Sequence, residues 1–98
     1  MPKLVIEEPH SLSRPEAMKR LRAAADRAAA KHGATVEQPS EYELVTAAFG
    51  ATGRMTCDDK RVVIELDLPL AAWLFRSRIE TEARREIRAV LDGKNSSA

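Results

Sequence analysis

The sequence contains one cysteine, Cys57, and two histidines, His10 and His32. A single cysteine excludes an internal disulfide and a multi-cysteine metal site, and it does not indicate an oxidising compartment. Neither histidine lies at a metal-ligand or nucleophile spacing from Cys57. We therefore expect no catalytic residues, no metal site and no cofactor, and we expect His10 to cap the start of a helix or to contact a sheet.

Long apolar segments are also missing. No stretch approaches the roughly 20 apolar residues that a membrane-spanning helix needs, and Glu7 and Glu8 interrupt the first segment too early for a signal peptide. These absences favour a cytoplasmic protein. Because 44% of the 98 residues are hydrophobic, we expect one domain over residues 1–93, followed by a disordered tail over residues 94–98.

A strong excess of one charge is the third absence, since the formal net charge is +1. The charge is unevenly distributed: residues 14–31 are basic and residues 34–68 are acidic, although solvated helix and strand faces also produce such a pattern. The C-terminal arginines alternate with glutamates and lack an aromatic strand platform beside them. We therefore expect ion pairs along a helix rather than nucleic-acid binding.

Local signals define the first two elements. β-Branched and apolar residues before Pro9 predict a strand over residues 3–8. A capping box with a proline in the first turn, at residues 13–16, predicts the start of a helix, and Gly33 predicts its end. The apolar positions of this helix recur at three- and four-residue spacing: Met18, Leu21, Ala25 and Ala28.

The rest of the chain predicts a meander and a second helix. Short segments rich in β-branched and aromatic residues, separated by turn residues, predict strands at about 34–38, 42–49, 53–57 and 61–67. Pro69 predicts the start of a final helix that runs to about Leu91. The order strand, helix, four strands, helix indicates an α+β fold with two layers, in which both helices cover one face of an antiparallel sheet of about five strands.

The start of the predicted final helix is apolar on every side. At about 100° per residue, one stripe should face the sheet: Ala72, Ile79, Ala83, Ile87 and Val90. Four large side chains lie outside it, next to the basic residues Arg76 and Arg78: Leu70, Trp73, Leu74 and Phe75. Either the fold covers them under the first helix and the loop at Pro9 and His10, or the helix begins later, or they form a contact surface.

Several motifs resemble those of a known family. His10-Ser11-Leu12, ahead of a helix, resembles the His-Ser-Leu-Gly opening of the polyhydroxyalkanoic acid system proteins, which are short bacterial proteins also described as granule-region proteins. Residues 53–57, 62–68 and 79–83 are similar to that family's Gly-x-Ile-x-Val hairpin, its paired strand and its final Ile-Glu-x-Glu-Ile helix. The chain departs from the family at Glu37-Gln38, where the family has a tryptophan, and at Pro69, where it has a glycine.

The resemblance implies association with storage-polyester metabolism or its granules, and it transfers no catalytic residue. We therefore expect a non-enzymatic accessory protein whose apolar patch, Leu70, Trp73, Leu74 and Phe75, contacts a granule, a lipid or a protein partner. Two alternatives remain open. One is a small module in which a curved sheet and the final helix enclose an apolar ligand, and the other is a homodimer whose apolar helix ends pair.

Overall fold

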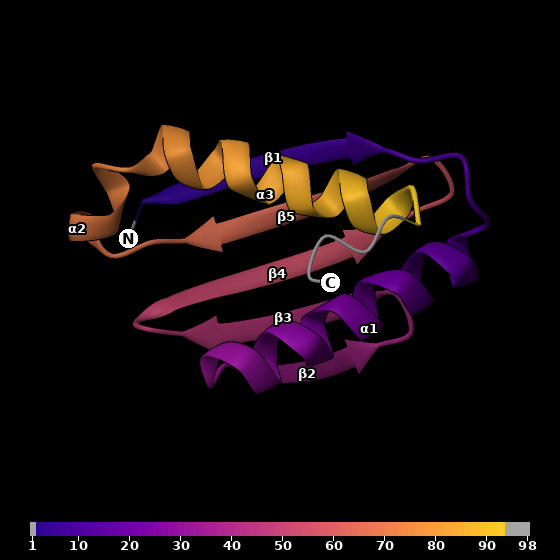
Figure 1. Ribbon diagram of the computed structural model, residues 1–98, viewed down its shortest axis with the longest axis horizontal. Helices are drawn as coiled ribbons and strands as arrows, with labels where there is room; N and C mark the ends of the chain where they lie inside the picture. The colour runs from indigo at the N-terminus through magenta and orange to yellow at the C-terminus, as the bar shows by residue number, and fades with distance from the viewer. Residues whose placement is uncertain (1, 94–98) are drawn as a thin grey trace.

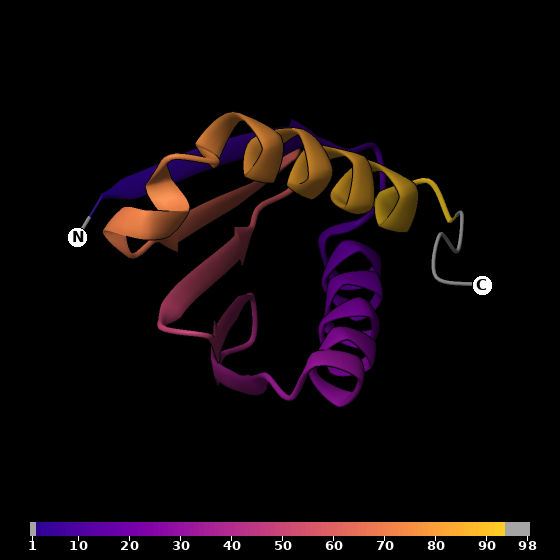
Figure 2. The same cartoon turned by 60° about the vertical axis from the view of Figure 1, so that its left-hand side comes forward.

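The computed structural model describes residues 2–93, which form a five-stranded antiparallel sheet with its helices on one face (Figures 1 and 2). The strand order is β1-β5-β4-β3-β2, so β1 lies beside the last strand of a four-stranded meander. This confirms the predicted α+β fold class, whereas the predicted tail at residues 94–98 lies outside the described residues. The elements are β1 (Lys3–Pro9), α1 (Arg14–His32), β2 (Thr35–Ser40), β3 (Glu43–Ala48), β4 (Ala51–Cys57), β5 (Arg61–Asp67), α2 (Leu70–Trp73) and α3 (Arg76–Leu91).

The helix α1 begins and ends where its local signals predict. The Ser13 hydroxyl accepts a hydrogen bond from the Glu16 N–H at 3.3 Å, and Gly33 ends the helix in the left-handed conformation, with φ of 71°. Its predicted apolar face is buried at Met18, Leu21 and Ala25. Ala28 is exposed instead and lines a cleft between α1 and α3. The two helices diverge across the sheet (Figure 1).

The core lies between the sheet and the two long helices. Its centre holds large apolar side chains from three strands and from α1, none of them more than 1% exposed: Ile6, Leu21, Leu44 and Val62. Burying each such side chain contributes about 1.5–3 kcal/mol. The second half of α3 packs against this cluster through the stripe that its sequence predicts: Ala83, Ile87 and Val90.

The β3–β4 hairpin is tighter than the sequence predicts. We expected one strand to end at residue 49 and the next to begin at residue 53, but Ala48 pairs with Ala51, so only Phe49 and Gly50 form the turn. Both have positive φ values, 54° and 77°. A two-residue turn of this kind matches the twist of the strands, and the ladder therefore extends into residues that resembled a loop.

The predicted final helix is two helices, so the expectation of one continuous helix was wrong. In the single turn of α2, the Pro69 carbonyl accepts hydrogen bonds from the N–H groups of Ala72 and Trp73, at 2.9 and 3.1 Å. The chain then tightens, because the Phe75 N–H donates to the carbonyl of Ala72, only three residues back. Phe75, with φ of −106° and ψ of 20°, interrupts the helix, and a regular 100° spacing does not continue past Leu74.

Charged side chains hold α3 across β1. The Arg84 guanidinium donates to the Glu7 carbonyl at 2.9 Å and to the Glu8 carboxylate at 3.0 Å, and Arg88 contacts the same carboxylate at 3.4 Å. Arg84 also pairs with Glu80 at 3.0 Å, as expected for charges one helical turn apart. These contacts fix the direction of α3 and leave α2 projecting at one end of the molecule (Figure 1).

Candidate functional site

The predicted patch residues lie on α2 and on the two residues after it. Three of the four are strongly exposed: Leu70 by 72%, Leu74 by 78% and Phe75 by 61%. Trp73 is half-buried. Within residues 2–93, therefore, neither α1 nor the loop at residues 9–10 covers these three side chains, which leaves them accessible to another surface.

Phe49 lies at the same end of the molecule. It occupies the tip of the β3–β4 turn and is 85% exposed. Because Thr52 pairs with Asp67, the β3–β4 turn lies at the end of the sheet where β5 ends and α2 follows (Figure 1). We call the four exposed side chains together the apolar end: Phe49, Leu70, Leu74 and Phe75.

Reasoning from the sequence missed Phe49. An aromatic residue at the end of a β-rich segment resembles the last residue of a strand, and the predicted strand over residues 42–49 therefore included Phe49. The available signal was its position directly before Gly50, where a two-residue turn requires both residues to adopt positive φ. A large apolar side chain in that conformation, pointing into solvent, is unfavourable for folding alone.

The two basic residues beside the patch differ in their contacts. The Arg76 guanidinium lies 5.1 Å from the centre of the Trp73 ring and donates a hydrogen bond to the Trp73 carbonyl at 3.1 Å. Arg76 therefore holds Trp73 in place through a cation–π contact. Arg78 is exposed and has no hydrogen-bond or ion-pair partner within residues 2–93, so its charge faces solvent beside the apolar end.

His10 and Cys57, which their sequence spacing did not connect, are neighbours in the fold. The Cys57 Sγ lies 3.8 Å from the His10 Nε2. The imidazole Nδ1 accepts a hydrogen bond from the Leu12 N–H at 3.2 Å, so in the neutral ring Nε2 carries the proton and donates to the Asp58 carbonyl at 2.8 Å. His10 thus fastens the start of α1 to the β4–β5 turn, which agrees with the predicted contact to the sheet.

This pair lacks the properties of a catalytic dyad. Cys57 is 2% exposed, and burial is the main cause that raises the pKa of its thiol above the ordinary value, although the nearby Arg14 guanidinium acts in the opposite direction. A nucleophilic thiol needs a lowered pKa and access to a substrate. The Arg14 side chain instead donates to the Cys57 carbonyl at 2.7 Å and stacks on the Tyr42 ring at 3.9 Å. The cluster closes one end of the core.

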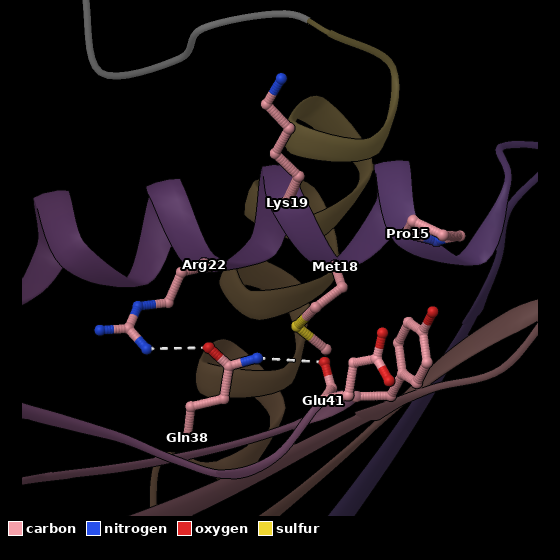
Figure 3. A pocket seen from close by; sticks show the side chains of 7 residues that line it. Pro15, Met18, Lys19, Arg22, Gln38 and Glu41 are labelled. Carbon is pink, nitrogen blue, oxygen red and sulfur yellow. Dashed lines mark hydrogen bonds between the residues drawn. The ribbon is translucent and has the colours of Figure 1, made fainter.

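A pocket of about 260 Å³ lies between α1 and the β2–β3 connection (Figure 3). Gln38 lies across the pocket, where it accepts a hydrogen bond from Arg22 and donates one to the Glu41 carbonyl, each at 3.0 Å. The side-chain amide of Gln38 thus has partners on both of its polar atoms, and its bond from Arg22 attaches α1 to β2. We assign no ligand to this pocket.

The described residues contain neither a metal-binding cluster nor a membrane-spanning helix. Within residues 2–93, no group of three or more His, Cys, Asp or Glu side chains is arranged to hold a metal ion. His32 lies exposed in the last turn of α1, whereas His10 lies in the loop between β1 and α1. No helix in the described part of the chain is long and apolar enough to cross a membrane.

Comparisons with known proteins identify one family. A family model described as "putative polyhydroxyalkanoic acid system protein" matches residues 4–91. The match begins at the second residue of β1 and ends at the last residue of α3, so it includes α2 and the β3–β4 turn. No curated protein and no solved structure matches the chain.

Proposed function

The chain belongs to the polyhydroxyalkanoic acid system family, and we propose on that basis that it is a non-enzymatic accessory protein that acts in the cytoplasm at the surface of storage-polyester granules. The apolar end is the contact in this proposal. The supporting observation is that four large apolar side chains from two separate segments are exposed together at one end of the fold.

The shape and chemistry of the apolar end suit a hydrophobic surface. Phe49 is at a hairpin tip, and Leu70, Leu74 and Phe75 lie on or directly after the single turn of α2; all four side chains are strongly exposed. The turn of α2 projects at one end of the fold (Figures 1 and 2). Protruding side chains can enter a polymer or lipid surface without matching a partner's shape. Removing each from water contributes about 1.5–3 kcal/mol, and several together offset the cost of association.

Cosedimentation with polyhydroxyalkanoate particles tests this function. The wild-type protein should pellet with the particles, and the Leu70→Ser/Leu74→Ser variant should bind at least about tenfold more weakly, because two buried leucines contribute more than one decade of affinity. Val5→Thr is the matched control: Val5 is also an exposed apolar residue, but it lies on β1. It should bind like the wild type.

The single tryptophan reports where contact occurs. Trp73 lies on α2 beside the apolar end, so acrylamide should quench its fluorescence less when the protein is bound to particles. Equal pelleting of the wild type and the double variant, with unchanged quenching, would remove the apolar end from the proposal. Binding to phospholipid vesicles but not to polyester would replace the granule with a lipid surface.

A further inference from the structure

A second region, between α1 and α3, has the features of a binding site. In Figure 1 α1 and α3 lie close together near the last turn of α3 and diverge from there across the sheet. A cleft of about 390 Å³ opens between them, with part of β4 as its floor. This volume falls in the range of about 300–1,000 Å³ that small-molecule pockets occupy.

The walls and floor of the cleft are apolar. One wall consists of small side chains of α1: Ala24, Ala25 and Ala28. The other wall consists of Ile87 and Val90 of α3. The floor is Met55, whose flexible thioether adapts to irregular partners. Met55, Ile87 and Val90 are all only half-buried although they belong to the margin of the core. The alanines of α1 are too short to reach them, so a groove remains.

The rim of the cleft carries cations. Arg27 and Lys31 line it from α1, together with His32. Within residues 2–93, neither Arg27 nor Lys31 has a hydrogen-bond or ion-pair partner, whereas other arginines of the helices, such as Arg20 and Arg84, are paired. Glu86 contributes one negative charge on the α3 side, so the rim is positive when His32 is neutral.

We propose that this cleft binds a single alkanoic acid, with the hydrocarbon chain against Met55, Ile87 and Val90 and the carboxylate between Arg27 and Lys31. The apolar groove accounts for the hydrocarbon chain of the ligand. Arg27 and Lys31, which have no partner in the described part of the protein, account for its acid group, since charge-assisted bonds from arginine and lysine favour carboxylates. The units of a polyhydroxyalkanoic acid are hydroxyalkanoic acids, which share the carboxylate and the alkyl chain of such a ligand. The site is separate from the apolar end and does not depend on granule contact.

Titration with decanoate, observed by NMR of ¹³C-methyl methionine, tests this proposal. Met55 lies on the cleft floor, whereas Met18 is buried on another side of α1 and serves as an internal reference. Below the micelle concentration, decanoate should shift the Met55 methyl signal saturably and leave the Met18 signal unchanged. Absence of a saturable Met55 shift, or equal shifts at both methionines, would overturn the proposal.

Two comparisons test the acid group. Decanol and decyltrimethylammonium carry the same chain without the carboxylate, and each should bind at least about tenfold more weakly than decanoate. The Arg27→Met/Lys31→Met variant should bind decanoate at least about tenfold more weakly than the wild type does. Its affinity for decanol should be unchanged. Equal binding of decanoate and decanol to the wild type would overturn the assignment of Arg27 and Lys31.

A filled cleft tests the location. Ala28→Trp places a large ring in the groove at an exposed helix position, so the fold should be retained, and decanoate binding should be lost. Ala30→Trp is the matched control, because Ala30 is also exposed on α1 but does not line the cleft. If both variants bind decanoate like the wild type, the proposed location is wrong. Neither result affects the polyester partitioning test, since Leu70 and Leu74 lie outside the cleft.

Discussion

The Arg20 guanidinium on α1 donates a hydrogen bond to the backbone carbonyl of Leu91, 2.8 Å away, at the last turn of α3. The same guanidinium pairs with Glu16 at 2.9 Å, so its position is fixed from within α1. The carbonyls of a last helical turn have no partner inside their own helix. Arg20 therefore supplies a cap for α3 and fastens the two helices together at the narrow end of the cleft.

Arg20→Ala should lower the free energy of unfolding by about 1–2 kcal/mol, because a hydrogen bond from a charged donor is lost and the Leu91 carbonyl loses its cap. Arg27→Ala is the matched control and should change the free energy little, since Arg27 has no partner within residues 2–93. Urea unfolding followed by circular dichroism measures both. Equal destabilisation by the two variants would show that the contact to Leu91 contributes nothing specific.

Phe49→Asn should stabilise the fold while weakening polyester binding. Phe49 has a φ of 54°, which costs a bulky residue of the order of 1 kcal/mol, and Asn-Gly is the preferred sequence for a two-residue turn of this type. Relief of that strain should raise the melting temperature by about 4–8 °C. The same change removes an aromatic ring from the apolar end, so particle binding should fall.

Phe49→Ala separates the two effects. It removes the ring but keeps a residue that disfavours positive φ, so particle binding should fall without the gain in melting temperature. Thermal unfolding and cosedimentation on the same preparations give both values. If Phe49→Asn is no more stable than the wild type, the turn is not strained, and if it binds particles equally well, Phe49 does not belong to the contact.

The elements that the sequence predicts well are those with local causes. The α1 helix follows from a cap, a proline in its first turn and Gly33, all within the segment itself, and β5 follows from the alternation of buried and partly exposed residues. The direction of α3 after the break has distant causes. The direction of α3 depends on Arg84 and Arg88 reaching Glu8, at separations of 76 and 80 residues, and no local pattern contains that information.

The candidate sites divide in the same way. Leu70 and Leu74 lie outside the helical stripe that should face the sheet, so the sequence pattern alone predicts that they can be exposed. The addition of Phe49 depends on the register that joins Thr52 to Asp67, and the cleft depends on the angle between α1 and α3. Ala28 shows what spacing alone does not predict: its position in the helical repeat predicts a core residue, but it lines the open cleft between α1 and α3.

The protein should be a monomer in solution. In the proposed function the apolar end contacts a granule and not a second copy of the chain, so light scattering should give a mass near 10.8 kDa at high protein concentration, for the wild type and for Leu70→Ser/Leu74→Ser alike. A dimeric wild type with a folded, monomeric double variant would identify the apolar end as a subunit interface. The granule proposal would then lose its main physical support.

Acid should destabilise the fold partly through Asp58. Its Oδ1 accepts hydrogen bonds from the backbone N–H groups of Lys60 and Arg61, at 2.8 and 2.7 Å, and these bonds, first that of Lys60, hold the pKa of the carboxyl below its ordinary value of 3.8. Because the folded pKa lies below the unfolded one, the ionised group stabilises the fold at pH values above about 4. This contribution is lost as the pH falls through the folded pKa.

Asp58→Asn tests this relation, because the amide oxygen can still accept from the turn but does not titrate in this range. Between pH 6 and pH 3, the unfolding free energy of the variant should fall less than that of the wild type, as measured by urea titration at each pH. Asp59→Asn, at the neighbouring position that accepts neither bond, should follow the wild-type profile. If Asp58→Asn retains the full wild-type slope, other carboxylates account for the acid sensitivity, and the β4–β5 turn is held by its backbone pairing and by His10.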